Sequence, residues 1–196
     1  MGRTAGRSGS DTRSSLLRAA ADAIRSRGPS ASLEDIARHS GITKSGLIYH
    51  FTSKDALIIE LIETLLAQFH ADIDQCVDRE DNQPGRLTRG YIRAMLAPSR
   101  NQVAARETLA VIVNLMTIPA VSEIARADAE KLEDRLRSDG LPRDVLTLVI
   151  SSTDGAHGAP LWGGSARVEE IHDLEQRLIQ LTYEPELWHD QPWKSS

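Results

Sequence analysis

Apolar residues recur along this chain at the spacings of three and four that place them on one face of a helix. No stretch alternates apolar and polar residues as a half-buried strand would. The pattern therefore predicts an all-α fold, with breaks where glycine and proline cluster. The expected helices cover about residues 11–27, two short stretches within 32–55, then 53–77, a helix ending at Pro98, 102–118, 120–138, 143–157 and 167–182.

The densest set of local folding signals lies between Ser32 and Asp55. Ser32 precedes a short apolar face and Asp35 follows three residues later, so the two side chains can form a capping box. Gly41 can adopt the positive φ that a tight turn needs, and Thr43 can cap the next helix. We therefore expect two short helices joined by a glycine turn and followed at once by a longer helix.

The second of these short helices is predicted to have an apolar back and a polar front. Leu47, Ile48 and Phe51 supply apolar positions at helical spacing. Between them lie side chains that can donate hydrogen bonds outward, namely Lys44, Ser45, Tyr49 and His50. A short helix of this kind suits the major groove of a duplex, whose edges carry phosphates.

The net charge of −5 is unevenly distributed along the chain. Residues 1–54 hold nine Lys or Arg against four acidic residues, whereas the remainder holds 14 against 24. Because the two short helices lie in the basic part, this division favours a basic N-terminal part that binds DNA, followed by an acidic remainder. The alternative is a solvated surface whose charges cluster by chance.

Residues 14–58 resemble the DNA-binding domain of the TetR family of bacterial transcriptional regulators. The resemblance rests on an ordered set of motifs: Ser32-Leu-Glu-Asp-Ile-Ala, Gly41-Ile-Thr-Lys, Tyr49-His-Phe and Ser53-Lys-Asp-Ala-Leu. The chain departs from the usual pattern by placing Ser45-Gly46 directly after Lys44 and Ile48 where an aromatic residue is common. These departures concern the DNA sequence that would be read rather than the fold.

The resemblance implies which residues contact a double-stranded DNA operator. They are Thr43, Lys44, Ser45, Gly46, Tyr49, His50 and Lys54. The two lysines would neutralise phosphates, the tyrosine and histidine would donate to phosphates, and the remaining three would approach base edges. The simpler alternative is that Tyr49 and His50 pack against Phe51 and that Thr43 only caps its helix.

The resemblance also implies that the body binds a small-molecule effector, whose identity the sequence leaves open. Residues that could line its pocket are Tyr91, Met95, Arg106, Asn114, Thr117, Asp154, His157 and Trp162. Asn114 and Thr117 are suggestive because they lie in helix 102–118, which is nearly all apolar from Leu109 onward and is expected to be buried on most sides. The alternative is that they bond to neighbouring helices or to the backbone.

A homodimer is the assembly that the resemblance implies, built from the last two long helices and their two-fold mates. Independently, helix 167–182 carries apolar residues at spacings of three, four and three, the narrow seam used in helix bundles. The predicted interface residues are Val149, Ile171, Leu174, Leu178 and Leu181.

We assign no catalytic residue, no cofactor and no metal site. Cys76 is the only cysteine, which excludes an intramolecular disulfide and a cysteine-based zinc site. Residues 151–157 offer serine, aspartate and histidine, but on one predicted helix and without a nucleophile elbow. Apolar runs are too short to span a membrane and residues 1–15 lack the apolar core of a signal peptide, so we expect a cytoplasmic protein with no membrane partner.

The predicted organisation is a disordered basic arm at 1–10, a helix-turn-helix DNA-binding domain at 11–52, a six-helix effector-binding and dimerisation domain at 53–183, and a tail at 184–196. The functional hypothesis is a repressor that a small-molecule effector releases from a pseudo-palindromic operator. The alternative is a protein of the same fold that senses or carries a ligand without binding a promoter.

Overall fold

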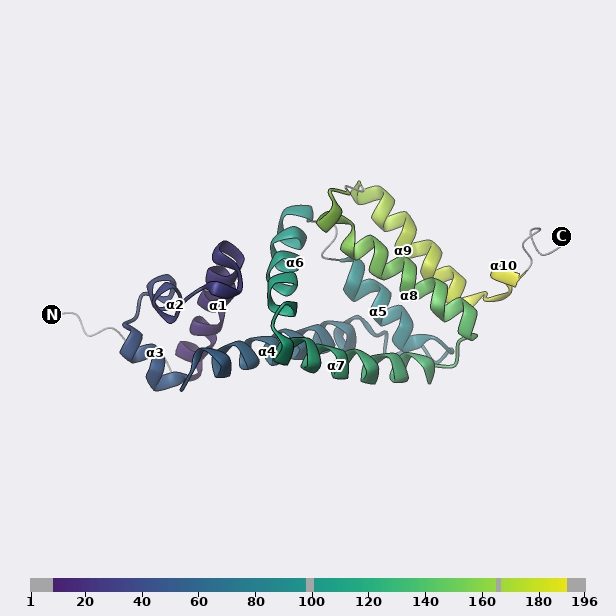
Figure 1. The fold of residues 1–196 in the computed structure, drawn as a ribbon. Helices are drawn as coiled ribbons and strands as arrows, with labels where there is room; N and C mark the ends of the chain where they lie inside the picture. Colours follow the sequence, from purple (N-terminus) through teal and green to yellow (C-terminus); the bar gives the residue numbers. More distant parts are fainter. Residues whose placement is uncertain (1–8, 98–100, 165–166, 190–196) are drawn as a thin grey trace. The chain divides into compact units, whose positions relative to one another are not determined.

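The computed structural model describes residues 9–97, 101–164 and 167–189, and over these ranges its regular structure is entirely helical (Figure 1). The predicted all-α class is therefore confirmed. Most of the predicted basic arm and Trp193 of the predicted tail lie outside the described residues. No single helix among those described is long and apolar enough to cross a membrane; only the bent pair Ala105–Met116 and Pro119–Arg137 meets that test together.

The chain divides into two compact units, and each is described by itself. Unit 1 comprises residues 1–66 and 110–126, and unit 2 comprises residues 67–109 and 127–196. Three helices have residues in both units: α4 (Lys54–Cys76), α6 (Gln102–Met116) and α7 (Pro119–Arg137).

Unit 1 holds the predicted pair of short helices. It contains α1 (Gly9–Arg27), a 3-10 turn η1 (Gly28–Ser30), α2 (Leu33–Ser40), α3 (Lys44–His50) and the first part of α4. Its core is aliphatic apart from Phe51, and residues from all four helices contribute to it. We call α1, α2 and α3 the head.

The local signals in the head act as their residue types predict. The Ser32 hydroxyl accepts from the Asp35 backbone N–H at 3.1 Å, and the Asp35 carboxylate accepts from the Ser32 N–H at 3.0 Å, which completes the capping box. Gly41 has φ of 71° at the end of α2. Thr43 caps α3 by accepting from the Gly46 N–H at 3.1 Å. The end of α2 and the beginning of α3 are thus set by local contacts of Ser32, Gly41 and Thr43.

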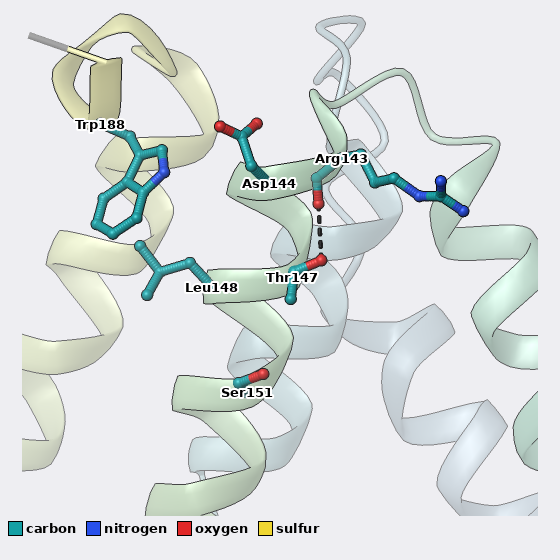
Figure 2. A pocket seen from close by; sticks show the side chains of 6 residues that line it. All are labelled: Arg143, Asp144, Thr147, Leu148, Ser151 and Trp188. Carbon is teal, nitrogen blue, oxygen red and sulfur yellow. Dashed lines mark hydrogen bonds between the residues drawn. The ribbon is translucent and has the colours of Figure 1, made fainter. Parts of the chain in front are cut away.

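Unit 2 is a helical bundle. Besides its share of α4, α6 and α7, it contains α5 (Arg86–Leu96), α8 (Arg143–Gly158), η3 (Ala159–Trp162), α9 (Val168–Tyr183) and the short α10 (Glu186–His189). Helix α5 packs against both α8 and α9. Trp188 of α10 packs against the cluster that α5, α8 and α9 share, and Figure 2 shows its ring on the side of α8 that carries Leu148.

A fully buried arginine joins three segments of unit 2. The Arg89 guanidinium donates to Asp81 at 2.6 Å and to the Thr182 hydroxyl at 3.0 Å, and also to the carbonyls of Gln83 and Pro84. It stacks on the Tyr183 ring, 4.0 Å from the centroid. Because its charge is paired and all three of its nitrogens donate hydrogen bonds, this buried arginine fixes the turn before α5 against the end of α9.

One prediction about burial is wrong. Helix α6 was expected to be buried on most sides, yet Val103, Val113 and Met116 are exposed in the single chain. An apolar composition alone does not say which partner covers each face of a helix.

Candidate nucleic-acid interface

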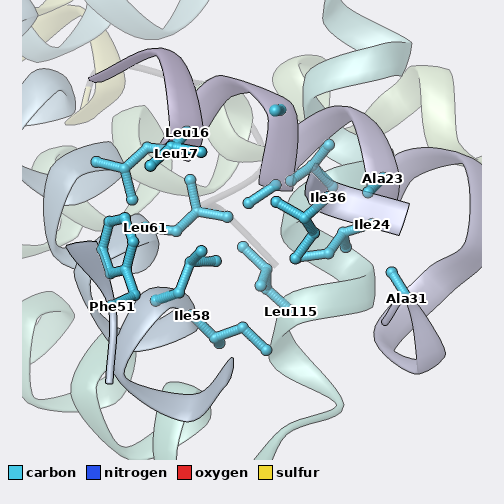
Figure 3. Packing of buried hydrophobic residues seen from close by; sticks show 14 of the residues in the cluster. Leu16, Leu17, Ala23, Ile24, Ala31, Ile36, Phe51, Ile58, Leu61 and Leu115 are labelled. Carbon is cyan, nitrogen blue, oxygen red and sulfur yellow. The ribbon is translucent and has the colours of Figure 1, made fainter. Parts of the chain in front are cut away.

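Helix α3 presents one side to the core and the other to solvent. Leu47 is fully buried, and Phe51, just after the helix, lies among Leu16, Leu17 and Leu61 (Figure 3). Residues 47 and 51 share a side because they are four apart. The side chain between them at position 49 belongs to Tyr49 and is 87% exposed.

The polar positions proposed for DNA contact lie on or beside this exposed side. Thr43, Lys44, Ser45 and Tyr49 are exposed, while Gly46, His50 and Lys54 are partly buried. Tyr49 and His50 touch through their rings, edge to face with centroids 5.3 Å apart. Since Tyr49 is 87% exposed, little of its side chain is left to pack against Phe51, the partner that the simpler alternative gave it. DNA contact itself remains a prediction.

Ile48 does not belong to the apolar back of α3, and that part of the prediction is wrong. It is 45% exposed, because a step of one residue turns it about 100° away from Leu47. The helix therefore offers a branched apolar side chain together with its polar donors. Such a side chain can contact the methyl group of thymine in the major groove.

Both lysines assigned to phosphate contact already have partners in the chain. The Lys44 ammonium pairs with the Glu34 carboxylate of α2. The Lys54 ammonium donates to the Pro29 carbonyl at 2.6 Å. An ammonium group has three donors, so neither contact excludes a phosphate.

Sequence reasoning missed the part played by Arg13. This residue of α1 donates to the carbonyl oxygen of His50 at the end of α3 and to both carboxylate oxygens of Glu60 on α4. The partners lie 37 and 47 residues away along the chain. No local pattern marks such a contact, and only the packed fold reveals it.

In unit 2, four of the residues proposed for effector binding come together between α5 and α8. The Tyr91 hydroxyl donates to Asp154, and His157 Nδ1 lies 2.9 Å from the Met95 carbonyl oxygen. Burial raises the pKa of Tyr91, and the hydrogen bond to Asp154 adds to that rise. Asp154 keeps part of its surface exposed, but the partial burial of its carboxyl raises its pKa, against the opposing effects of Tyr91 and of His157.

The other four effector candidates do not join this group. Arg106 and Trp162 are exposed, Trp162 to 89%. Asn114 donates to the Ala110 carbonyl at 2.8 Å, and Thr117 donates to the Asn114 carbonyl at 2.7 Å. Both contacts are local to the end of α6, as the alternative reading of those two residues supposed.

An open groove on α8 was not foreseen. It has a volume of about 750 Å³ and is lined by Arg143, Asp144, Thr147, Leu148, Ser151 and Trp188 (Figure 2). The Thr147 hydroxyl is bonded to the Arg143 carbonyl at 2.8 Å. None of the predicted effector residues lines this groove.

The apolar seam of α9 packs inside the chain. The predicted interface residues belong to, or pack against, one cluster with α5: Val149, Ile171, Leu174, Leu178 and Leu181. Val149, Ile171 and Leu178 are 0%, 4% and 6% exposed. Side chains this buried in the single chain have little surface to offer a second copy, and their assignment to a dimer interface remains a prediction. Residue spacing reveals an apolar face without saying whether the facing helix is the chain's own.

Comparison with known families matches both parts of the chain. A family described as bacterial regulatory proteins, tetR family, matches residues 16–61. A family described as the tetracyclin repressor-like C-terminal domain matches residues 85–183. Together they cover most of the head and most of unit 2.

A similarity to one individual regulator covers a shorter part of the chain. The HTH-type transcriptional regulator RutR of Escherichia coli (strain K12) is 38% identical over 69 residues, 35% of this chain and 32% of RutR. The match thus spans about a third of the length of this relative. It is a similarity in part of the chain only.

Solved structures show the same fold over nearly the whole chain. A transcriptional regulator from Rhodococcus sp. Rha1 has a TM-score of 0.66 and 21% identity, covering 88% of this chain and 96% of that one. A TetR transcription regulator from Haloarcula marismortui ATCC 43049 has a TM-score of 0.66 and 19% identity, covering 89% and 98%. At these identities the likeness concerns the fold alone.

Proposed function

The chain belongs to the TetR family of bacterial transcriptional regulators, and on that basis we propose that it binds operator DNA through α3 and regulates transcription. The observation that carries the proposal is the exposed side of α3. Tyr49 on that side is 87% exposed, whereas Leu47 on the opposite side is fully buried. A helix held by its apolar side and exposing its donors is suited to a groove.

Within this proposal the residues of α3 divide by role. Lys44, Tyr49 and His50, with Lys54 at the start of α4, would contact phosphates and set the register. Thr43, Ser45 and Gly46 would lie nearest the base edges, because they surround the start of the helix. Phosphate contacts position a protein on DNA, whereas base contacts give sequence specificity.

The proposed regulator is a homodimer controlled by a small molecule. Leu174 and Leu181, which keep part of their surface, and the exposed sides of α8 and α9 would form the interface. A two-fold dimer would present its two α3 helices about one DNA turn, about 34 Å, apart on a pseudo-palindrome. We further propose a cytoplasmic location and no enzymatic activity.

The effector would act on unit 2, where Tyr91 of α5 and Asp154 and His157 of α8 form a polar group. An effector that binds better to the form with low operator affinity shifts the population toward that form. Since α4 has residues in both units, it is the candidate element for transmitting the change. Repression relieved by the effector is the direction we propose.

The test is a mobility shift with DNA from upstream of the protein's own gene, titrated with salt. Wild-type protein should bind, and affinity should fall steeply as salt rises, because phosphate neutralisation releases counterions. Lys44→Ala and Tyr49→Ala should each weaken binding, whereas the control Arg137→Ala, at an exposed position of unit 2, should not. Unaltered binding in both α3 variants would refute the site, and no DNA binding at all would favour a ligand sensor without a promoter.

A further inference from the structure

Arg13 of α1 joins α3 and α4 through contacts with three residues, His50, Phe51 and Glu60. Its Nη1 donates to the His50 carbonyl oxygen at 2.7 Å. Its Nε and Nη2 donate to the two carboxylate oxygens of Glu60. Its guanidinium carbon lies 4.3 Å from the centroid of the Phe51 ring. One side chain therefore meets the last residue of α3, the residue that follows it, and α4.

Helix α3 needs external contacts to fix its orientation. It has seven residues, and an isolated helix of that length is not stable in water. Leu47 is its only fully buried side chain, and the buried Phe51 just after the helix is a second apolar anchor on the same side. The Thr43 cap restrains the beginning of the helix. At its end, a directional polar contact would add to the non-directional packing of Phe51.

The Arg13 contact has the chemistry for that directional restraint. The carbonyl end of a helix carries partial negative charge, which a guanidinium group stabilises. The planar guanidinium presents its donors in a rigid fork, so gripping Glu60 with two of them fixes the direction of the third. The carbonyl of His50 is thereby held at a set place relative to α4.

We infer that Arg13 is a positioning residue that sets the angle at which α3 meets DNA, and that Glu60 holds Arg13 in place. The inference rests on the proposed DNA-binding function. Arg13 would act through α3 and would touch no phosphate itself. Specific affinity should therefore depend on Arg13, whereas the number of phosphate contacts should not.

The experiment uses the full chain and a duplex that the wild-type protein enriches from a random-sequence library. An unselected duplex of equal length measures non-specific affinity. The variants are Arg13→Gln and Glu60→Gln. The matched control is Arg18→Gln, which removes the same charge from an exposed position of the same helix.

Arg13→Gln and Glu60→Gln should each lower affinity for the selected duplex by about tenfold, the size expected for a charged hydrogen bond. Affinity for the unselected duplex should change by less than about twofold, and the slope of log affinity against log salt should stay constant. The double variant should be no worse than Arg13→Gln alone, because both changes break one link. Arg18→Gln should leave the ratio of the two affinities unchanged.

Equal ratios for Arg13→Gln and Arg18→Gln would overturn the inference. So would a salt slope that falls by about 0.9, because Arg13 would then be contacting a phosphate itself. If Arg13→Gln does not fold, Glu60→Gln and Arg13→Lys decide: a loss of specificity in both supports the inference, and no loss in either refutes it. Failure of the wild type to enrich any duplex would instead remove the proposed function, and the inference with it.

Discussion

The ammonium group of Lys44, the first residue of α3, is paired with the carboxylate of Glu34 on α2. Both side chains are about half exposed. The hydrogen bond from Lys44 is the main reason that the pKa of Glu34 lies below its usual value. The lysine proposed to meet a phosphate is thus neutralised in the free chain by an acid of the head itself.

Glu34→Gln should therefore strengthen DNA binding. The substitution frees Lys44 and removes a negative charge beside the DNA, and for an exposed pair we expect a gain of about threefold at moderate salt. Mobility shift measures it. The control is Glu123→Gln, an exposed acid of unit 1 paired with Arg126. Binding weaker than wild type would show that Glu34 positions Lys44 rather than competing for it.

Asp35→Asn should destabilise the head at neutral pH but not in acid. The pKa of Asp35 is lowered by hydrogen bonds from the Ser32 N–H and hydroxyl, and then by Arg27 and Arg38. A carboxyl with a lowered pKa stabilises the folded state above the ordinary value of about 4, and this contribution is lost as pH falls through the folded-state pKa. Urea unfolding across that range measures it. A difference between variant and wild type that persists in strong acid would contradict the account.

Asp154→Asn should change the stability at neutral pH in the opposite direction to Asp35→Asn. Burial raises the pKa of Asp154, so the folded state binds more protons than the unfolded state just above the ordinary value of about 4. Stability is therefore lost as pH rises through that window. The neutral variant should be more stable than wild type at neutral pH and equal to it in acid, with Asp144→Asn as the control. A variant less stable than wild type at neutral pH would contradict the account.

The sequence could predict the head because its signals are local. Ser32, Gly41 and Thr43 act on backbone groups within three or four residues, so their types and spacing suffice. The sequence also predicted the apolar face of α9, but it did not indicate which helix packs against that face. Whether Ile171 packs on α5 of the same chain or on a second copy depends on the whole fold.

Contacts between distant residues could not be predicted in this way. Arg13 looks like any other basic residue of α1, and its two partners lie far along the chain. Tyr91 and Asp154 were both chosen as pocket candidates, yet nothing in the sequence indicated that they bond to each other. Trp188 could have packed or extended, and the structure places it against the bundle.

Arg89→Met should lower the free energy of unfolding by about 3 kcal/mol, because it leaves the Asp81 carboxylate buried without its charged partner. Arg89→Lys should lower the free energy of unfolding by less, since it keeps the positive charge. Some loss should remain because an ammonium cannot reach every acceptor. Urea unfolding monitored by far-UV circular dichroism measures both. A loss below about 1 kcal/mol for Arg89→Met would place the pair among weak surface contacts.

The central claim is that the exposed side of α3 faces the DNA, and photo-crosslinking tests it most directly. A photoreactive phenylalanine analogue is placed at Tyr49 in one variant and at Trp162 in another; these two aromatic side chains are exposed to nearly the same degree, 87% and 89%, in different units. The account predicts that, with the enriched duplex bound, position 49 crosslinks to DNA and position 162 does not. A bound complex in which position 49 gives no crosslink, or no more than position 162, would contradict it.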